Sequence, residues 1–298
     1  MQTKIKSSGD GSDAEKGLVV ERRFTSADQD PFESFDWIDM DVEIRNPDGS
    51  MADSIEGVKL PSGFSGIPGK VCAQKYLRKA GVPKHLRNVP EDGIPIWLQR
   101  SEPDHERLQS IDAAERMGGE TDGRQLFRRL AGTWTYWGWK YGYFASEADA
   151  RAYFDEMCYL IASQRSAPNS PQWFNTGLHW AYGIEGPPQG HSFVDPETGE
   201  VGLSTSAYEH PQPHACFIQS VSDSLVGGTD SIMGLWNREA LLFKYGSGTG
   251  SNFSNIRGAG EPLSGGGTSS GLLSFLKIGD RAAGAIKSGG TTRRAAKM

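Results

Sequence analysis

The chain has 298 residues, of which 37% are hydrophobic and 23% charged, a balance typical of a soluble globular protein with one large domain or two ordinary ones. No apolar run reaches about 18 residues, which excludes a membrane-spanning helix, and the formal net charge of −6 argues against a general nucleic-acid-binding protein. Three widely spaced cysteines do not make a disulfide framework. The first residues carry no apolar signal-peptide core, so we expect a cytoplasmic protein.

The N-terminal part of the chain is predicted to contain a tail, a hairpin and a helical region. Residues 1–27 are polar and carry glycine and serine, which predicts a disordered tail. Within residues 28–165, apolar and acidic residues alternate from Trp37 to Ile44, and Asn46–Gly49 supplies turn residues. This pattern predicts a hairpin with one wet face. A short helix is expected from Val71 to Ala80.

Two longer helices are predicted next along the chain. The first spans Arg124–Tyr143 and is very aromatic, which we interpret as a packed core rather than a platform for stacking bases. The second is capped by Ser146 and reaches about Gln164. Cys158 falls on the apolar face of the second helix, and Cys72 lies inside the short helix. Both thiols are therefore predicted to be buried.

The last part of the chain, residues 166–298, is organised around a thiol. A strand is predicted over His214–Val221 and contains Cys216 among residues that favour strands. An amphipathic helix follows, capped at Thr229 or Asp230 and ending at Lys244. A further helix is expected to begin at Ser269 or Ser270 and to extend toward Lys287, ending at Gly289–Gly290.

Between these two helices lies a glycine-rich stretch, Gly246–Gly250, predicted to be a loop whose backbone can approach a ligand closely. It follows a helix and no helix begins at its end, so a dinucleotide-binding Rossmann site is not favoured. No Gly-Lys-Ser or Gly-Lys-Thr follows, which excludes a Walker loop. The segment His210–Cys216 contains histidine and cysteine, but its two prolines prevent a helical ligand pair and no fourth ligand lies nearby. We therefore expect no metal site.

Several longer motifs, in one order along the chain, resemble those of ribonucleotide reductases. They are Tyr76–Pro83, Pro168–Asn175, Ala215–Phe217, Lys244–Gly250 and Ile286–Met298. The resemblance runs from about Phe24 to the last residue and is closest to the adenosylcobalamin-dependent class II enzymes. It implies an α/β fold with an α+β N-terminal region. Residues 166–298 would form the first part of the ten-stranded α/β barrel of that family, preceded by a mainly helical domain.

The same resemblance implies a role in reducing ribonucleotides to 2′-deoxyribonucleotides. Cys216 would lie on the first barrel strand and be one of two thiols that reduce the ribose. Loss of the 2′-hydroxyl needs a proton donor and two electrons, which a dithiol supplies when it becomes a disulfide. Ser170, with backbone around Ala215, would hold a substrate phosphate. Ser247 and Gly248 would line the ribose and base.

Members of this family also bind a dNTP or ATP effector at a dimer interface. Asp223 matches the residue that binds the effector sugar, and Arg257 matches a triphosphate ligand, a role that guanidinium chemistry favours. Lys244 is a weaker match for the same phosphates. Ser264 begins the segment that corresponds to the effector loop, and Lys287 lies in the loop between effector and substrate bases.

The family's radical cysteine, its second redox cysteine and its main phosphate-binding segment match no residue of this chain. We therefore expect the chain to be inactive alone and to need the remaining C-terminal part of the reductase, as a continuation or as a second polypeptide. The resemblance also implies adenosylcobalamin, with contacts outside this chain, a thioredoxin or glutaredoxin-type reductant, and a homodimer. No nucleic-acid or membrane partner is implied, and a diphosphate and a triphosphate substrate both stay open.

Two other functions are compatible with the sequence. One is the large subunit of a class I reductase, which takes its radical from a separate metalloprotein. The Pro-Asn-Ser-Pro-Gln-Trp and Gly-Gly-Thr-Thr-Arg-Arg stretches favour class II over this alternative. The other is a non-catalytic module for nucleotide binding or assembly, in which Cys216 would have no redox role.

Overall fold

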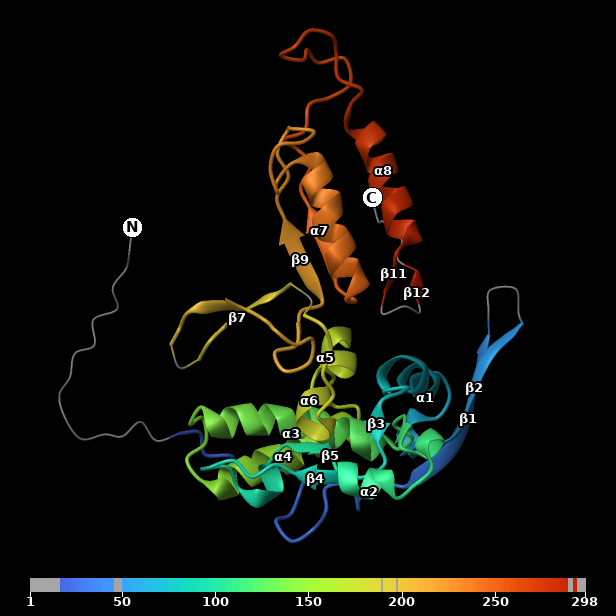
Figure 1. Ribbon diagram of the computed structural model, residues 1–298, viewed down its shortest axis with the longest axis vertical. Coiled ribbons are helices and arrows are strands. Elements are labelled where there is room, and N and C mark those ends of the chain that lie inside the picture. The colour runs from blue at the N-terminus through green and yellow to red at the C-terminus, as the bar shows by residue number, and fades with distance from the viewer. Residues whose placement is uncertain (1–16, 46–49, 189, 197, 289–291, 294–298) are drawn as a thin grey trace, which may run out of the picture.

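The computed structural model describes residues 17–45, 50–188, 190–196, 198–288 and 292–293. They form a lower lobe, built by the chain up to Ala162, and an upper lobe, built from Cys216 onward, with a linking region between the two (Figure 1). Three predicted features lie outside the described residues: the first 16 residues of the tail, the turn at 46–49 and the helix end at 289–290.

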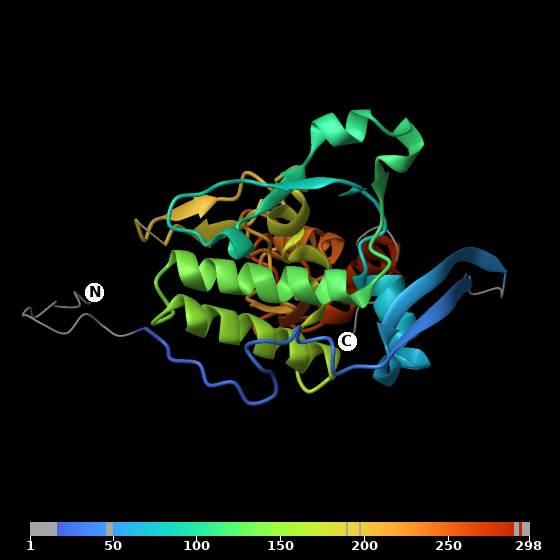
Figure 2. The ribbon, with the colours of Figure 1, turned by 90° about the horizontal axis from the view of Figure 1, so that it is seen from below.

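Two helices form the centre of the lower lobe, α3 (Gly123–Lys140) and α4 (Glu147–Ala162), and they lie side by side in Figure 2. Each begins at a side-chain cap. Asp122 accepts a hydrogen bond from the first turn of α3 within a capping box, and Ser146 accepts one from the first turn of α4. Both predicted helices are confirmed to within a few residues.

Two aromatic side chains of α3 contribute to the main hydrophobic core, Phe127 as a member and Trp134 by packing against it, whereas Tyr136, Trp137 and Trp139 are half-buried outside it, so the packed-core expectation holds only in part. Phe127 is fully buried there, and its ring centroid lies 6.4 Å from that of Trp173 in an edge-on arrangement. Cys72 and Cys158 are members of the same buried cluster, which confirms their prediction as core residues. Burial raises the pKa of Cys72 to about 12 and that of Cys158 well above its usual value.

The predicted hairpin is present as β1 (Trp37–Arg45) and β2 (Met51–Pro61), which pair antiparallel and project from the lobe (Figures 1 and 2). Val42 and Val58 point into the core, whereas Asp41 is exposed. The alternation of apolar and acidic residues therefore corresponds to one buried face and one wet face.

The short helix predicted over Val71–Ala80 is shifted toward the N-terminus. It consists of α1 (Ile67–Val71) and a π-helical turn, η2 (Cys72–Tyr76). The helix ends early because the backbone N–H of Arg78 donates to the Glu120 carboxylate (2.8 Å) instead of to a helix carbonyl. The other short elements of this lobe are η1 (Ser62–Phe64), β3 (Val82–Pro83), β4 (Leu86–Asn88), η3 (Ile96–Leu98), β5 (Ser101–Pro103), α2 (His105–Gln109), η4 (Ala113–Glu115) and β6 (Met117–Gly118).

Residues 17–27, predicted as part of a disordered tail, are held against α4, so the prediction is wrong for them. Arg22 forms an ion pair with the buried Asp155 at 2.7 Å. Glu156 accepts hydrogen bonds from the successive N–H groups of Arg23–Thr25. Burial alone would raise the pKa of Glu156, but these hydrogen bonds outweigh it and lower the pKa below its usual value. The polar segment is ordered because its charges and N–H groups find partners more than a hundred residues away.

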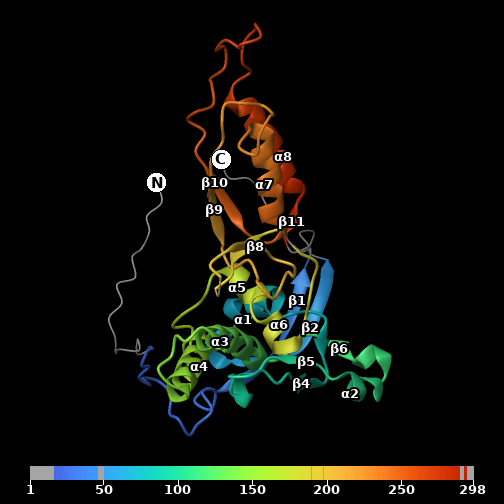
Figure 3. The ribbon, with the colours of Figure 1, turned by 60° about the vertical axis from the view of Figure 1, so that its left-hand side comes forward.

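A linking region leads from the lower lobe to the upper one. It contains α5 (Ser170–Asn175), α6 (Leu178–Tyr182) and a small antiparallel hairpin of β7 (Ser192–Val194) and β8 (Val201–Leu203). Helix α5 lies between the two lobes in Figures 1 and 3.

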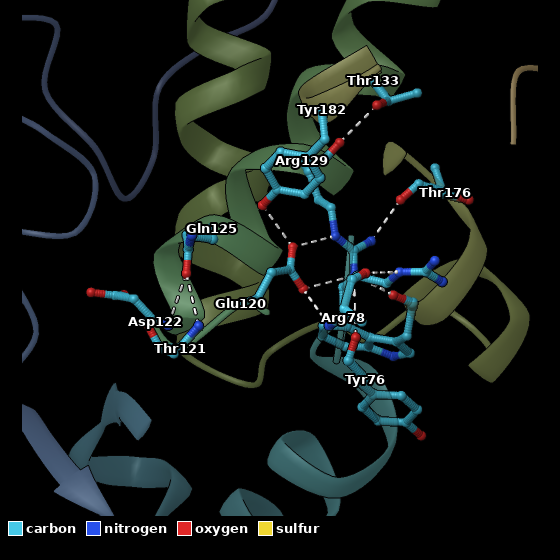
Figure 4. Close-up of polar contacts among 12 residues, drawn as sticks. Tyr76, Arg78, Glu120, Thr121, Asp122, Gln125, Arg129, Thr133, Thr176 and Tyr182 are labelled. Atoms are coloured by element: carbon cyan, nitrogen blue, oxygen red, sulfur yellow. Dashed lines mark hydrogen bonds and ion pairs between the residues drawn. The ribbon is translucent and has the colours of Figure 1, made fainter. Parts of the chain in front are cut away.

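A buried ion pair joins this linking region to α3 (Figure 4). The guanidinium of Arg129, 1% exposed, lies 2.7 Å from the carboxylate of Glu120, which also accepts a hydrogen bond from the Tyr182 hydroxyl at 2.8 Å. The same guanidinium donates to three backbone carbonyls, those of Tyr76, Trp173 and Thr176. One pair of charges thus fixes η2, α5 and α6 relative to α3.

The upper lobe is a β-α-β unit. Strand β9 (Cys216–Gln219) pairs in parallel with β10 (Gly248–Ser251), and α7 (Ile232–Lys244) connects them. Helix α8 (Leu272–Ala285) packs on α7. The two helices approach closely at Gly279, where a Cβ would come within 2.6 Å of the Trp236 ring.

The glycine stretch predicted as a loop is largely a strand, since β10 begins at Gly248. Glycine is a poor strand former, but β9 supplies a parallel neighbour whose backbone groups pair with it. The sequence pattern could not reveal that partner because it lies about thirty residues earlier and is joined through a helix.

Three helix ends in this lobe also differ from expectation. Helix α7 is capped by Ser231, which accepts a hydrogen bond from the N–H of Gly234, rather than by Thr229 or Asp230. Helix α8 begins after Gly271 with no side-chain cap and ends at Ala285. Beyond it, β11 (Lys287–Ser288) pairs with β12 (Thr292–Arg293), so the chain near Lys287 is extended rather than helical.

The described residues thus form a mixed α/β fold, in agreement with the expected class. Their strands pair only in two-stranded sheets, and these residues contain no closed barrel. The ten-stranded barrel, the mainly helical domain before it and the proposed domain limits stay predictions. None of the helices in the described part of the chain is both long and apolar enough to cross a membrane.

Replacing Arg129 with methionine should destabilise the protein by about 3–5 kcal/mol, because the Glu120 carboxylate would stay buried without its partner. Urea unfolding followed by tryptophan fluorescence measures this loss. The neighbouring Arg128 pairs with Asp30 on the exposed side of the same helix, so Arg128→Met is the matched control, with an expected cost of about 0–1 kcal/mol. Equal losses for the two variants would contradict the role assigned to the buried pair.

Candidate functional site

The thiol of Cys216 is exposed at the beginning of β9, on the sheet face that points away from α7. Alternation along the strand sets this orientation. Gln219 accepts a hydrogen bond from Arg238 of α7 (2.7 Å), so the face shared by Phe217 and Gln219 looks toward the helix. Cys216 and Ile218 occupy the opposite face, where Ile218 is 91% exposed.

Gly248 lies directly beside this thiol. It is the register partner of Cys216, and its N–H donates to the carbonyl of Ala215 at 2.5 Å. A Cβ at Gly248 would lie 3.4 Å from the Cys216 sulfur and 3.7 Å from the Ala215 carbonyl oxygen. The absence of a side chain therefore leaves the sulfur accessible over bare backbone. The structure brings together three of the predicted substrate-site residues.

Ser247 was also expected to line the ribose, and in the structure its side chain is turned inward. Ser247 is 0% exposed, and its hydroxyl donates to the carbonyl of His214 (2.8 Å) while accepting from the amide of Gln212 (2.5 Å). A hydroxyl with both roles filled inside the protein is not available to a ligand. Only the backbone of Ser247 stays near the thiol.

Ser170 comes from the linking region, as the first residue of α5. It is exposed, and its hydroxyl lies 3.2 Å from that of Tyr76. Asn169 caps the helix by accepting the N–H of Gln172. At the other end of α5, the side-chain amide of Asn175 donates to the backbone carbonyl of Gln212 at 3.5 Å. Helix α5 is thereby joined to the segment that leads into β9.

Asp223 and Arg257, the two strongest effector candidates, form a pair. The guanidinium Nε of Arg257 lies 2.5 Å from the Asp223 carboxylate, and the Arg257 backbone N–H also donates to it. These hydrogen bonds and the positive charge hold the pKa of Asp223 below its usual value. The residues follow the carboxyl ends of β9 and β10, so the parallel pairing places both loops at one end of the sheet.

The other three effector candidates are placed differently. Lys244 is the last residue of α7, whereas Asp223 precedes the first; a helix of 13 residues separates the two ends by roughly 18 Å. Within one chain, Lys244 therefore does not join the Asp223–Arg257 pair. Ser264 is exposed in a loop whose base is closed by a bridge between Pro262 and Thr268.

Arg257 also holds that loop, since its guanidinium donates to the Pro262 carbonyl at 2.9 Å. The backbone of Lys287 lies in β11, and its side chain is outside the described residues.

Two features of the site were missed from the sequence. One is Gln212, whose side chain connects the two strands; a glutamine between two prolines directly before a strand was the available signal. The other is a cavity of about 680 Å³ on the helix side of β9, lined by residues that include Phe217, Leu242 and Tyr245. The alternation of β9 puts Phe217 in this cavity and Cys216 on the opposite face, so the cavity is not the thiol site.

No cluster of three His, Cys, Asp or Glu side chains that could hold a metal occurs in the part of the chain that the structure describes. The described residues also show no built surface for a corrin. The face that bears Cys216 is open, and the cavity of about 680 Å³ lies on the other side of the sheet.

Comparison with known proteins gives the family. Residues 39–164 match the family model described as "Class II vitamin B12-dependent ribonucleotide reductase", and residues 214–298 match "Ribonucleotide reductase, barrel domain". A vitamin B12-dependent ribonucleotide reductase from Agrobacterium fabrum is 63% identical over 281 residues, and one from Bradyrhizobium diazoefficiens is 61% identical over 281 residues. A vitamin B12-dependent ribonucleoside-diphosphate reductase from Mycobacterium tuberculosis is 43% identical over 147 residues, which is 49% of this chain and 16% of that protein.

The chain therefore belongs to the ribonucleotide reductases. Within them it belongs to the class II, vitamin B12-dependent family, and the class I alternative is not supported. The first two relatives match 94% of this chain, but the chain spans only 22% of their length. It corresponds to their N-terminal portion.

The three thiols should differ sharply in reactivity. In the folded protein at about pH 8, Cys216 should be alkylated by iodoacetamide, because it is exposed. Cys72 should not react, since a pKa of about 12 instead of 9.0 leaves about one thousandth of the usual thiolate. Cys158 is fully buried and should behave alike. Mass spectrometry of the labelled peptides measures all three, with urea-unfolded protein as the reference. Rapid labelling of a second thiol in folded protein would contradict the assignment.

Proposed function

We propose that this chain forms the specificity-determining part of a class II ribonucleotide reductase and contributes one of its two redox thiols, Cys216. The observation that carries the proposal is the exposed thiol beside Gly248, on the face of β9 and β10 that no helix of the described residues covers. Family membership supports the proposed chemistry, and this geometry supports Cys216 as the residue that takes part in it.

The uncovered face fits the interior of a larger barrel. Helix α7 covers one side of the strand pair, as helices cover the outside of α/β barrels, and the other side bears Cys216 and the 91% exposed Ile218. Further strands from the remaining C-terminal part of the reductase would pair with the open edges of β9 and β10. They would enclose the thiol, and the ten-stranded barrel would follow from that completion.

The chemistry assigned to Cys216 is reduction of the ribose carbon that loses its 2′-hydroxyl. The thiol gives a proton to the leaving oxygen, which departs as water. Cys216 and a second cysteine together supply two electrons and a second hydrogen, so that a C–H bond replaces the broken C–O bond at that carbon while the two sulfurs become a disulfide. A thioredoxin or glutaredoxin-type dithiol reduces that disulfide afterwards.

The second cysteine must come from the remaining part of the enzyme, because Cys72 and Cys158 are buried in the lower lobe. Adenosylcobalamin, when bound, would supply the radical that starts the reaction. Its contacts are assigned to that same remaining part.

Substrate positioning would use groups around the thiol. The bare backbone at Gly248 and Ala215 offers close approach to a sugar, and the exposed Ser170 hydroxyl can donate to a phosphate oxygen. The described residues do not distinguish a diphosphate from a triphosphate.

The effector would bind where Asp223 and Arg257 meet. Arg257 uses Nε and one terminal nitrogen for Asp223 and the Pro262 carbonyl, so its second terminal nitrogen makes no hydrogen bond among the described residues. A dNTP or ATP phosphate could accept from that group, and the Asp223 carboxylate could accept from the sugar hydroxyl. The loop carrying Ser264 is joined to this pair through the hydrogen bond from Arg257 to Pro262. A nucleotide bound at the pair could therefore change the position of this loop. The reductase would be a homodimer located in the cytoplasm.

Changing Cys216 to serine in the full-length reductase should reduce dithiol-dependent turnover by about three orders of magnitude or more, because a hydroxyl cannot form the disulfide. Deoxyribonucleotide formation is measured by chromatography with adenosylcobalamin and a dithiol. Cys72→Ala is the matched control and should keep turnover, while dNTP affinity should be unchanged in both variants. Undiminished turnover of Cys216→Ser would favour a non-catalytic role for this chain.

Changing Arg257 to methionine should weaken dNTP binding by about 10- to 100-fold, the usual effect of losing a hydrogen bond to a charged group. Equilibrium dialysis with labelled dNTP measures the affinity. Lys244→Met removes an equal charge at the other end of α7, and it should leave the affinity unchanged. The reverse result would move the phosphate site to the other end of the helix.

A further inference from the structure

The side chain of Gln212 closes a ring of hydrogen bonds directly before the thiol strand. Its amide oxygen accepts the backbone N–H of His214, and its amide nitrogen lies 2.5 Å from the Ser247 hydroxyl and 2.9 Å from the His214 carbonyl oxygen. The Ser247 hydroxyl donates to the same carbonyl at 2.8 Å. Gln212 is 7% exposed and Ser247 0%, so the bond between these two side chains is shielded from water.

The ring joins the two chain segments just before their first paired residues, one residue before Gly248 and two before Cys216. Ser247 precedes Gly248, and His214 precedes Ala215, whose carbonyl accepts the Gly248 N–H at 2.5 Å. The next step of the ladder places Gly248 opposite Cys216. Any shift between Ser247 and His214 therefore becomes a shift between the thiol and the backbone beside it.

Packing alone does not fix this segment. The cavity of about 680 Å³ borders it, and both Gln212 and His214 line that cavity. A chain beside open space lacks the close contacts that hold a core residue in place. Polar contacts also hold it, among them the ring itself and the hydrogen bond from Asn175 to the Gln212 carbonyl, which ties the segment to the helix that begins at Ser170.

We propose that Gln212 is a positioning residue for the Cys216 thiol: by joining Ser247 to His214 it sets the register of β10 against β9 and fixes the sulfur beside Gly248. The role requires a donor and an acceptor on one side chain, which glutamine provides and methionine does not. The inference rests on the proposed redox function of Cys216 and adds a residue that does not touch the substrate.

The first test compares Gln212→Met with Gln99→Met in the full-length reductase. Gln99 lies in the lower lobe, where its side chain makes one long hydrogen bond, at 3.5 Å to the Ile94 carbonyl. Gln212→Met should lower kcat by about 10²-fold, the effect of a misplacement near 1 Å, with little change in KM because Ser170 still holds the phosphate. The control should match the unmodified enzyme. An unchanged kcat in Gln212→Met would overturn the proposal.

A second variant separates positioning from simple destabilisation. In Gln212→Glu a protonated carboxyl keeps one donor and one acceptor, whereas the ionised form has no donor for Ser247. Its activity relative to the unmodified enzyme should therefore recover as the pH is lowered, and that of Gln212→Met should not. A constant ratio across the pH range in both variants would overturn the proposal.

A third measurement is independent of turnover. Hydrogen–deuterium exchange of the Gly248 amide should accelerate in Gln212→Met while exchange in α3 stays unchanged. Equal acceleration in both regions would mean general loss of stability and would contradict the positioning role. If Cys216→Ser keeps full turnover, the redox assignment fails, and the Gly248 exchange rate still reports whether Gln212 sets the register.

Discussion

The buried pair of Arg129 and Glu120 is the interaction on which the arrangement of this chain depends. Two charges removed from water must satisfy one another, and the remaining donors of the guanidinium need acceptors. Those acceptors are backbone carbonyls of η2, α5 and the turn before α6. Segments that are distant in sequence are therefore fixed around one side chain rather than by apolar packing alone.

The effect of this pair extends toward the upper lobe. Helix α5 is fixed at Trp173 and Thr176 by Arg129, and its Asn175 reaches the carbonyl of Gln212. Gln212 then connects to the beginnings of β9 and β10. A continuous set of polar contacts thus runs from the centre of the lower lobe to the thiol strand. Alternation within β9 then sets the direction of its side chains, because it places Phe217 toward α7 and Cys216 toward the open face.

Local signals in the sequence predicted much of the fold. The caps at Asp122 and Ser146, the alternation in the first hairpin and the apolar spacing around Cys158 depend on neighbouring residues only. The strand around Cys216 was predicted for the same reason. Features that depend on distant partners were not: residues 17–27 are ordered by Glu156 and Asp155, and Gly248–Ser251 forms a strand because β9 lies beside it.

The candidate site, too, has features that the sequence predicted and features that only the structure shows. Motif resemblance proposed the residues, but it could not show that Ser247 is turned inward, that Asp223 and Arg257 pair, or that Lys244 lies at the far end of α7. Charged residues are also expected at the surface by default, so the sequence did not predict that Glu120 and Arg129 form a buried ion pair.

The exposed Ile218 on the open face of β9 makes the chain prone to association with other strands during its synthesis. An isoleucine 91% exposed on a strand whose outer edge has no partner among the described residues is a template for association with another strand. During synthesis the thiol strand emerges before any later strand that would cover it, so the growing chain passes through a stage in which this surface attracts chaperones or other copies. Production of this region by itself should therefore be limited by aggregation, and a charged residue in place of Ile218 should relieve it.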